Sequence, residues 1–316
     1  MTIIKSLAPK VQLIQISEEY NDQRLDNFLF TFLKGVPKSR IYRSVRTGEV
    51  RVNKGRVDAK YRLLAGDIVR IPPLRTATRD ESSFVANDLR IYLQESVLFE
   101  DDGFIVINKP AGFAVHGGSG VFSGIIEGLR IIRPDAHFLE LVHRLDKDTS
   151  GCLLIAKKRS ALRALHVLFR EDLISKSYLA LLQGQWHEMH KIVNAPLLKF
   201  VNQGGERRVV VNKQGKEAET SFRRVKLFAE STLVEAFPKT GRTHQIRVHA
   251  LSMGHPIVGD ERYGNDDMNK FFSIKGYKRM FLHAANLAFK HPVTGEALTF
   301  NAPLPEQLTK LLQNEI

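Results

Sequence analysis

The sequence contains a single cysteine, Cys152, among its 316 residues. One thiol cannot form a disulfide within the chain, and it cannot supply the ligands of a cysteine-rich zinc site. The sequence also lacks any run of about 18 apolar residues, the length that a membrane-spanning helix needs. Residues 1–10 have no apolar core of the kind that a secretory signal carries. We therefore expect a cytoplasmic protein that does not bind a membrane.

Signatures of phosphate-binding loops and of metal sites are also lacking. The glycines at 117, 118 and 120 follow neither the Walker spacing nor the dinucleotide fingerprint. His244 and His249 are five residues apart, whereas the metalloprotease helix carries two histidines at i and i+4 with a glutamate between them. The sequence predicts no metal and no organic cofactor.

Acidic residues are too few to balance the basic ones. There are 34 Asp and Glu against 47 Lys and Arg, which gives a net charge of +13. This excess favours a polyanionic partner. It is concentrated in residues 38–62, where nine cations face only Glu49 and Asp58. The nine are Lys38, Arg40, Arg43, Arg46, Arg51, Lys54, Arg56, Lys60 and Arg62.

Residues 20–72 are expected to form a small unit of their own. Apolar residues at 25, 28, 29, 32 and 33 recur at helical spacing until Pro37 interrupts them. A second helix is predicted from Ser39 to Gly48, with arginines at 40, 43 and 46 on one face. A short strand at 50–52 and further strand-like segments up to Ile71 complete the unit. A solvated helix face would also explain the arginines, but the excess of cations favours RNA contact.

The rest of the chain is divided by composition. Residues 1–19 form an N-terminal extension, and residues 73–96, which begin with two prolines and are strongly polar, are expected to be a linker. From residue 97 to 316 short apolar runs mix with helical patterns. Strands are predicted at 105–107, 152–156, 178–182 and 233–237, and an amphipathic helix at 160–170. Strands and helices do not alternate regularly, which disfavours a doubly wound sheet.

Residues 143–151 join two apolar runs through a polar loop, so Asp146 is expected at the edge of a buried sheet. Arg144 and Lys147 flank this carboxylate, an arrangement that suits a nucleophile or base acting on an anionic partner. A purely structural turn is the plain alternative, because Asp, Ser and Gly are good turn residues. A calcium loop is excluded because Lys157 stands where that loop needs a glutamate.

Two motifs together resemble the RluA-type pseudouridine synthases, which isomerise uridine to pseudouridine within RNA. They are His-Arg-Leu-Asp at 143–146 with Thr-Ser-Gly at 149–151, and Gly-Arg-Thr-His-Gln-Ile-Arg-Val-His at 241–249. His-Gly-Gly-Ser-Gly at 116–120 is similar to the type C branch of the family's large-subunit ribosomal enzymes. Arg-Leu-Asp-Asn-Phe-Leu at 24–29, Gly-Glu-Val-Arg-Val-Asn at 48–53 and Gly-Asp at 66–67 resemble an S4-type RNA-binding domain.

The resemblance implies an α+β fold. A small S4-type (αL) domain is followed by a pseudouridine-synthase catalytic domain with a mixed, largely antiparallel sheet and a central cleft. The domain boundaries expected are 20–72 for the first and 97–316 for the second. The resemblance also implies that the second helix and the following strand of the S4-type domain face RNA, through Lys38, Arg40, Arg43, Arg46, Arg51, Lys54 and Arg56.

The same resemblance assigns roles in the catalytic domain. Asp146 is the carboxylate that attacks C1′ of the ribose or removes a proton from C2′, and both routes stay open. Arg247 pairs with that carboxylate, and Tyr178 stacks on the target base and can assist proton transfer. Arg144 fills the gap that the flipped base leaves, and Leu282 packs against the base. For Tyr178 and Leu282 a place in the core is the plain alternative.

The expected substrate is large-subunit (23S-type) ribosomal RNA or its assembly intermediates, modified at more than one uridine by a monomeric enzyme. Three alternatives remain at this stage. The chain could be a noncatalytic S4-domain assembly factor that binds ribosomal RNA, or a pseudouridine synthase that acts on transfer RNA. A carboxylate-dependent RNA glycosidase would need a second carboxylate as its acid, and Asp148 suits a turn better than that role.

Overall fold

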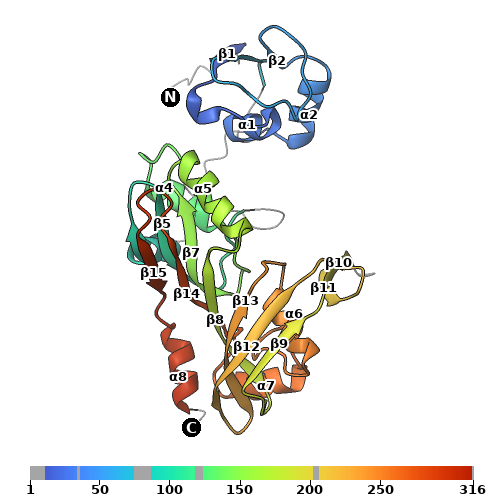
Figure 1. Ribbon diagram of the computed structural model, residues 1–316, viewed down its shortest axis with the longest axis vertical. Helices are drawn as coiled ribbons and strands as arrows, with labels where there is room; N and C mark the ends of the chain where they lie inside the picture. Colours follow the sequence, from blue (N-terminus) through green and yellow to red (C-terminus); the bar gives the residue numbers. More distant parts are fainter. Residues whose placement is uncertain (1–10, 34–35, 75–86, 118–123, 202–205, 315–316) are drawn as a thin grey trace, which may run out of the picture. The chain divides into compact units, whose positions relative to one another are not determined.

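The computed structural model divides the chain into two compact units, residues 1–83 and 84–316. Both units are shown in Figure 1. The finer boundaries expected from the sequence stay a prediction. The structure describes residues 11–33, 36–74, 87–117, 124–201, 206–314.

The first unit is a three-stranded antiparallel sheet covered on one face by two helices. The helices are α1 (Leu25–Phe32) and α2 (Lys38–Arg46), as the apolar spacing predicts. A 3-10 turn, η1 (Glu18–Tyr20), precedes them. The strand order is β1 (Gln12–Gln15), β3 (Ile68–Ile71), β2 (Arg51–Val52). Gly48 follows α2 with a φ of 74°, a conformation that favours glycine and turns the chain into β2.

The second unit is built on a ten-stranded sheet. Its pairings are antiparallel except between β7 and β14, which run parallel. The sheet is therefore mixed and largely antiparallel, as expected. Its main path is β4 (Val97–Glu100), β5 (Phe104–Lys109), β7 (Ser150–Ala156), β14 (Leu282–Lys290), β8 (Ser175–Gln183), β13 (Ser231–Pro238), β12 (Glu219–Leu227), β9 (His190–Asn194). β15 (Ala297–Asn301) pairs with β14, and β6 (Glu140–Leu141) with β7.

Both faces of the sheet's first half are buried. Ile105 and Ile107 of β5 point into one core, to which α3 (Asn87–Glu95) and α4 (Ile125–Ile132) also contribute. Phe104 and Val106 point into another, with Leu165 of α5 (Arg159–Arg170). Because both faces of β5 and β7 are buried, these strands appear in the sequence as continuous apolar runs.

The second half of the sheet carries the remaining helices. α6 (Gln245–Ser252) buries Ile246 and Ala250 against β8 and β13. α7 (Asp266–Ile274) and α8 (Glu306–Asn314) pack on a neighbouring core. β10 (Leu197–Val201) and β11 (Arg207–Val211) form a separate hairpin beside α6. Among the described residues, no helix is long and apolar enough to cross a membrane.

The structure differs from the sequence expectations in two places. Residues 12–15, expected in an extension over 1–19, form β1, because their backbone pairs with β3 from Gln12–Ile71 to Gln15–Ile68. Residues 87–95, expected in the linker over 73–96, form α3, because Leu89 and Leu93 find a core to enter and are 2% and 0% exposed. Residues 1–10 and 75–86 lie outside the described part.

Candidate active site

Asp146 lies on the loop that joins β6 to β7. Leu145 is buried in the core beside it, and the Thr149 N–H donates to the Asp146 carbonyl at 3.2 Å. The loop leads into β7, whose second residue is Gly151; its φ of 111° and its close approach to β14 leave no room for a side chain. A Cβ there would collide with the carbonyl oxygen of Ala284. The Thr-Ser-Gly part of the motif thus fixes where the loop enters the sheet.

His143, at the start of the loop, holds the backbone. The Leu154 N–H of β7 donates to His143 Nε2 at 3.1 Å. Burial, with a smaller contribution from the charge of Lys176, lowers the pKa of His143 to about 4. The ring is therefore neutral near pH 7, as an acceptor must be. His143 is part of the loop's support.

A buried lysine supports the loop through hydrogen bonds, a role that the sequence does not predict. Lys109, at the end of β5, is 0% exposed. Its ammonium donates to the carbonyls of Pro110, Lys147 and Thr149 at 2.8, 3.0 and 2.8 Å. Burial lowers the pKa of Lys109 to about 7, although the negative charge of Asp148 opposes that shift. Two of the three bonds go to loop residues on either side of Asp148.

Replacing Lys109 with Met should therefore loosen the loop. The carbonyls of Pro110 and Thr149 would lose this donor, at a cost of about 1–3 kcal/mol for each one that finds no substitute, whereas the Lys147 carbonyl keeps the Gly112 N–H at 2.9 Å. We expect a lower melting temperature and a turnover number reduced by about tenfold or more, because the loop that carries Asp146 would lose part of its support. Lys158→Met is the matched control, because the Lys158 side chain is 58% exposed, and both quantities should stay close to wild type.

Arg247 of α6 connects the Asp146 loop to a second, buried carboxylate. Its Nη1 donates to Asp146 Oδ2 at 2.9 Å. Its Nε and Nη2 donate to the two oxygens of Asp260 at 2.7 and 2.8 Å. Burial alone would lower the pKa of Arg247, but the bonds and charge of Asp260, and then of Asp146, raise it above its ordinary value. The guanidinium is thus a permanent cation held in one orientation.

Asp260 is the anchor of this arrangement. It is 1% exposed and also accepts the backbone N–H groups of Arg262 and Tyr263 at 3.0 and 3.1 Å. Four donors thus converge on one buried carboxylate, as a buried charge requires. No sequence motif pointed to Asp260, because it lies 13 positions beyond Arg247, outside both recognised motifs.

His244 and Tyr263 close the site on another side. His244, left-handed at φ 54°, precedes α6, and its Nε2 lies 3.9 Å from Asp146 Oδ2. Tyr263 Oη accepts the Val209 N–H at 3.1 Å, so its own hydrogen is available for His244 Nδ1 at 2.8 Å. Burial lowers the pKa of His244, although Asp146 opposes the shift. This places the N–H of a neutral ring on the side of Asp146.

The other predicted active-site residues take different positions. Tyr178 of β8 is half-buried at the edge of two cores, and burial, reinforced by the charge of Asp146, raises its pKa above the ordinary value. Leu282 of β14 is 3% exposed among core residues. Arg144 is exposed on the loop, two residues before Asp146. The structure thus brings Arg247 into contact with Asp146 and shows no direct bond from the other three to that carboxylate.

Among the residues with described positions, no group of three or more His, Cys, Asp or Glu is placed to hold a metal ion. Of the stretch at 116–120 that carries part of the resemblance, residues 118–120 lie outside the described positions. The central cleft expected beside Asp146 stays a prediction.

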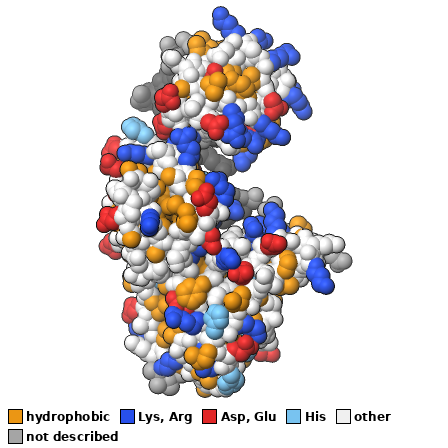
Figure 2. Space-filling view, viewed as in Figure 1, with side chains coloured by type: hydrophobic (Ala, Val, Ile, Leu, Met, Phe, Trp, Pro, Cys, Tyr) orange, Lys and Arg blue, Asp and Glu red, His pale blue; other side chains and the backbone are white. Residues whose placement is uncertain are grey.

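In the first unit, six of the seven cations expected at an RNA surface are exposed. Arg40 is the exception, because it is half-buried and donates to Glu49 at 2.8 Å and to Ser44 at 2.9 Å. Its charge therefore serves the fold. Figure 2 shows basic side chains around much of this unit's visible edge. The exposed six are Lys38, Arg43, Arg46, Arg51, Lys54 and Arg56.

Comparison with known protein families matches both units. Residues 103–252 match the family described as RNA pseudouridylate synthase, and residues 23–69 match the S4 domain. Asp146, Tyr178 and Arg247 all lie in the first of these ranges.

Known relatives match over nearly the whole chain. Ribosomal large subunit pseudouridine synthase C of Yersinia pestis is 56% identical over 310 residues, 98% of this chain and 97% of that protein. The protein of the same name from Escherichia coli strain K12 is 53% identical over 313 residues, 98% of each. Among solved structures, human RNA Pseudouridylate Synthase Domain Containing 4 superposes with a TM-score of 0.59 at 28% identity, over 72% of this chain and 95% of that one.

Proposed function

This chain belongs to the RNA pseudouridine synthase family, and from that membership we propose that it isomerises specific uridines of large-subunit ribosomal RNA, with Asp146 as the catalytic carboxylate. The relatives that are more than half identical over the full length carry the enzyme class. Their names also support the ribosomal target. Within the site, the observation that carries the proposal is the Asp146–Arg247–Asp260 chain of charge-assisted bonds.

The reaction breaks the bond from N1 of the base to C1′ of the ribose, turns the base, and forms a bond from C5 to C1′. The proton on C5 is lost and N1 gains one, so no atom is added and nothing is oxidised. Asp146 would either attack C1′ as a nucleophile or remove the C2′ proton as a base. Both routes need one carboxylate held still, which is what Arg247 provides by fixing Oδ2.

The remaining predicted residues fit this reaction as proposals. Because its pKa is raised, the Tyr178 phenol stays protonated near pH 7, so it can donate a hydrogen bond or a proton but cannot act as a base at rest. Arg144 is exposed and unpaired among the described residues, so its planar guanidinium is available to replace an extruded base in the RNA stack. Leu282 would form the apolar wall behind that base.

Because the His244 ring is neutral and its N–H lies on the side of Asp146, we expect the activity to fall at low pH. Protonation of the ring below its lowered pKa would place a second cation beside the Asp146–Arg247 pair and disturb the donor pattern with Tyr263. We expect the His244→Gln variant, which keeps a donor and an acceptor, to retain activity with a weaker loss at low pH. Single-turnover rates from pH 5 to pH 8 measure this, and an unchanged profile would remove His244 from the account.

We further infer that the enzyme works as a monomer, because one chain carries both an S4-type RNA-binding unit and the Asp146 site. We also infer a cytoplasmic location, from the ribosomal RNA substrate proposed above. The target can be tested with purified protein and three unmodified transcripts: large-subunit ribosomal RNA, small-subunit ribosomal RNA and transfer RNA. Site-resolved pseudouridine mapping should find product at discrete positions of the first alone. Product in transfer RNA would change the assigned substrate. Binding without product in any of them would favour an assembly factor.

A further inference from the structure

The sheet of the first unit leaves one face uncovered. Side chains alternate between the two faces of a strand. Ile14 and Val69, which lie opposite each other on β1 and β3, both point toward the helices. On the open face Leu13 lies opposite Arg70, and Arg70 lies opposite Arg51. These three side chains therefore form a single row across all three strands.

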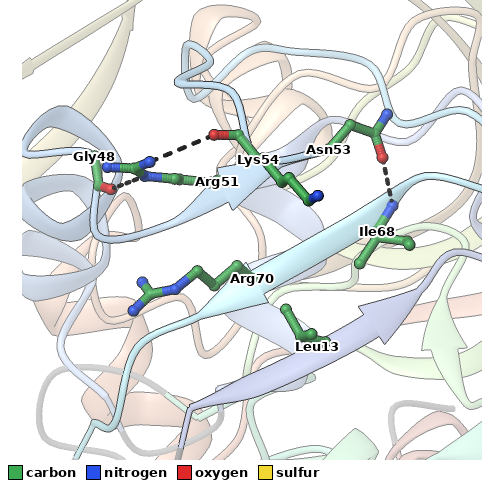
Figure 3. Close-up of a pocket in the computed structure, with 7 residues that line it drawn as sticks. All are labelled: Leu13, Gly48, Arg51, Asn53, Lys54, Ile68 and Arg70. Atoms are coloured by element: carbon green, nitrogen blue, oxygen red, sulfur yellow. Dashed lines mark hydrogen bonds between the residues drawn. The ribbon is translucent and has the colours of Figure 1, made fainter.

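This open face is hollowed into a groove with a volume of about 870 Å³ (Figure 3). Leu13 and Ile68 line it and are 68% and 47% exposed. Exposed apolar side chains that occur together in a concave site indicate a surface that a ligand covers. The volume is larger than a single phosphate group needs and lies in the range of sites for small organic ligands.

The groove is bordered by cations. Arg51, Lys54 and Arg70 line it, and none of them forms an ion pair with a carboxylate in the described part of the chain. Like charges on directly opposed residues of a sheet repel each other, as Arg51 and Arg70 do here. An anion lying between them would relieve that repulsion.

The cations are held in position by backbone groups. Arg51 Nε donates to the Gly48 carbonyl at 3.1 Å, and Arg70 Nη1 donates to the neighbouring Glu49 carbonyl at 2.6 Å. Both guanidinium groups therefore lie at one end of the groove, each with N–H groups to spare. Lys54 sits in a tight turn at φ 66°, and its side chain extends toward β3 (Figure 3).

The turn that carries Lys54 is fixed to β3. Asn53, also left-handed at φ 49°, accepts the Ile68 N–H at 2.9 Å and donates to Asp67 at 2.7 Å. The groove is thus largely formed before any ligand binds, which lowers the entropic cost of binding.

We propose that this groove binds unpaired nucleotides of the RNA substrate, with phosphates at Arg51, Lys54 and Arg70 and a base or sugar over Leu13 and Ile68. The proposal rests on the proposed function, which makes RNA the ligand. It adds a site on the open sheet face to the RNA-contact surface expected on α2 and the strand that follows it. Unpaired nucleotides fit because a duplex keeps its base faces stacked inside the helix, so that only an unpaired base can lay a face on Leu13 and Ile68. A protein partner would need acidic side chains spaced to reach all three cations, whereas RNA carries one phosphate at every nucleotide.

The apolar floor is tested with the full chain by fluorescence anisotropy, using a labelled oligouridylate and a labelled RNA duplex. Ile68→Thr keeps a β-branched residue in the strand and removes apolar contact. It should weaken oligouridylate binding about threefold to tenfold and leave duplex binding unchanged. Leu64→Thr is the matched control, because Leu64 is 58% exposed in the same unit and does not line the groove.

The cations are tested through the salt dependence of the same binding. Lys54→Met should reduce the slope of log K against log salt by about 0.7 for the single strand, the value for one lost phosphate contact. Lys60→Met removes an equal charge from an exposed position outside the groove and should leave the slope near wild type. Melting curves of each variant check that the unit stays folded.

The outcomes separate the groove from the catalytic proposal. Equal losses on single strand and duplex would overturn the claim for unpaired nucleotides and leave a phosphate site. Wild-type binding by both Ile68→Thr and Lys54→Met would overturn the groove as an RNA site, even with pseudouridine formation intact. Loss of single-strand binding would support the groove even if ribosomal RNA proved not to be the substrate.

Discussion

Replacing Asp146 with Asn is expected to reduce pseudouridine formation by at least about a thousandfold while leaving RNA affinity within about twofold of wild type. Asn keeps the size of the side chain and an oxygen for Arg247, whose Nη1 lies 2.9 Å from Oδ2. It can neither form an ester at C1′ nor accept the C2′ proton, so both candidate routes fail. The measurement is a single-turnover assay with saturating enzyme, paired with a binding assay on the same RNA.

Asp148→Asn is the matched control for this variant. Asp148 lies on the same loop, two residues away, and is exposed. Its loss removes one nearby negative charge from the surroundings of Lys109, so we expect an effect of no more than about threefold. If Asp146→Asn kept its activity, or Asp148→Asn lost as much, the catalytic carboxylate would have been assigned to the wrong residue. Release of free uracil by wild type would instead indicate a glycosidase.

Replacing Arg247 with Met should cause the second largest effect, on both stability and activity. Asp260, 1% exposed, would be left as a buried charge without its cation. Breaking a buried pair from one side costs about 3–5 kcal/mol. Among the described contacts shorter than 3 Å, Arg247 is the only charged donor to Asp146, and this variant removes it. We expect a melting temperature lower by at least about 5 °C and turnover reduced by about a hundredfold or more.

The double variant Arg247→Met, Asp260→Asn separates the two effects. Asn removes the unpaired charge and keeps an acceptor for the backbone N–H groups that Asp260 now binds. Stability should recover much of the loss, because replacing both members of a buried pair is far cheaper than removing one. Activity should stay low, because Asp146 is still without its guanidinium. Recovery of activity along with stability would show that Arg247 acts on the fold alone.

Local patterns predict much of the fold because the elements concerned are set by their own side chains. The strands expected at 105–107, 152–156, 178–182 and 233–237 lie inside β5, β7, β8 and β13, and the helix expected at 160–170 is α5. In each of these segments, the apolar residues that become buried lie close together in the sequence. The helices of the first unit follow the same rule.

The two elements that form in segments expected to be an extension or a linker, β1 and α3, depend on partners far along the chain. β1 has four residues, none of them buried, and exists because its backbone pairs with β3. α3 has a weak apolar pattern in a polar stretch, and Leu89 and Leu93 become core only against α4 and β5. Propensity within the segment carries neither signal, because tertiary contact decides.

The residues of the active site also differ in how far the sequence predicts them. Asp146 could be singled out from its own loop, and its pairing with Arg247, 101 positions away, followed from the family resemblance alone. The supporting roles of Asp260 and Lys109 could not be predicted by either route, because they consist of bonds to Arg247 and to backbone carbonyls that exist only in the folded chain. A buried lysine at the end of a strand has no distinguishing sequence pattern.

The most direct test of the central claim is a pseudouridine map of ribosomal RNA from cells that lack this protein, complemented with wild type or with Asp146→Asn. The account predicts that discrete large-subunit positions lose pseudouridine, that wild type restores them, and that Asp146→Asn, expressed at the same level, does not. A map unchanged by the loss of the protein would contradict the ribosomal target, and restoration by Asp146→Asn would contradict the catalytic role of Asp146.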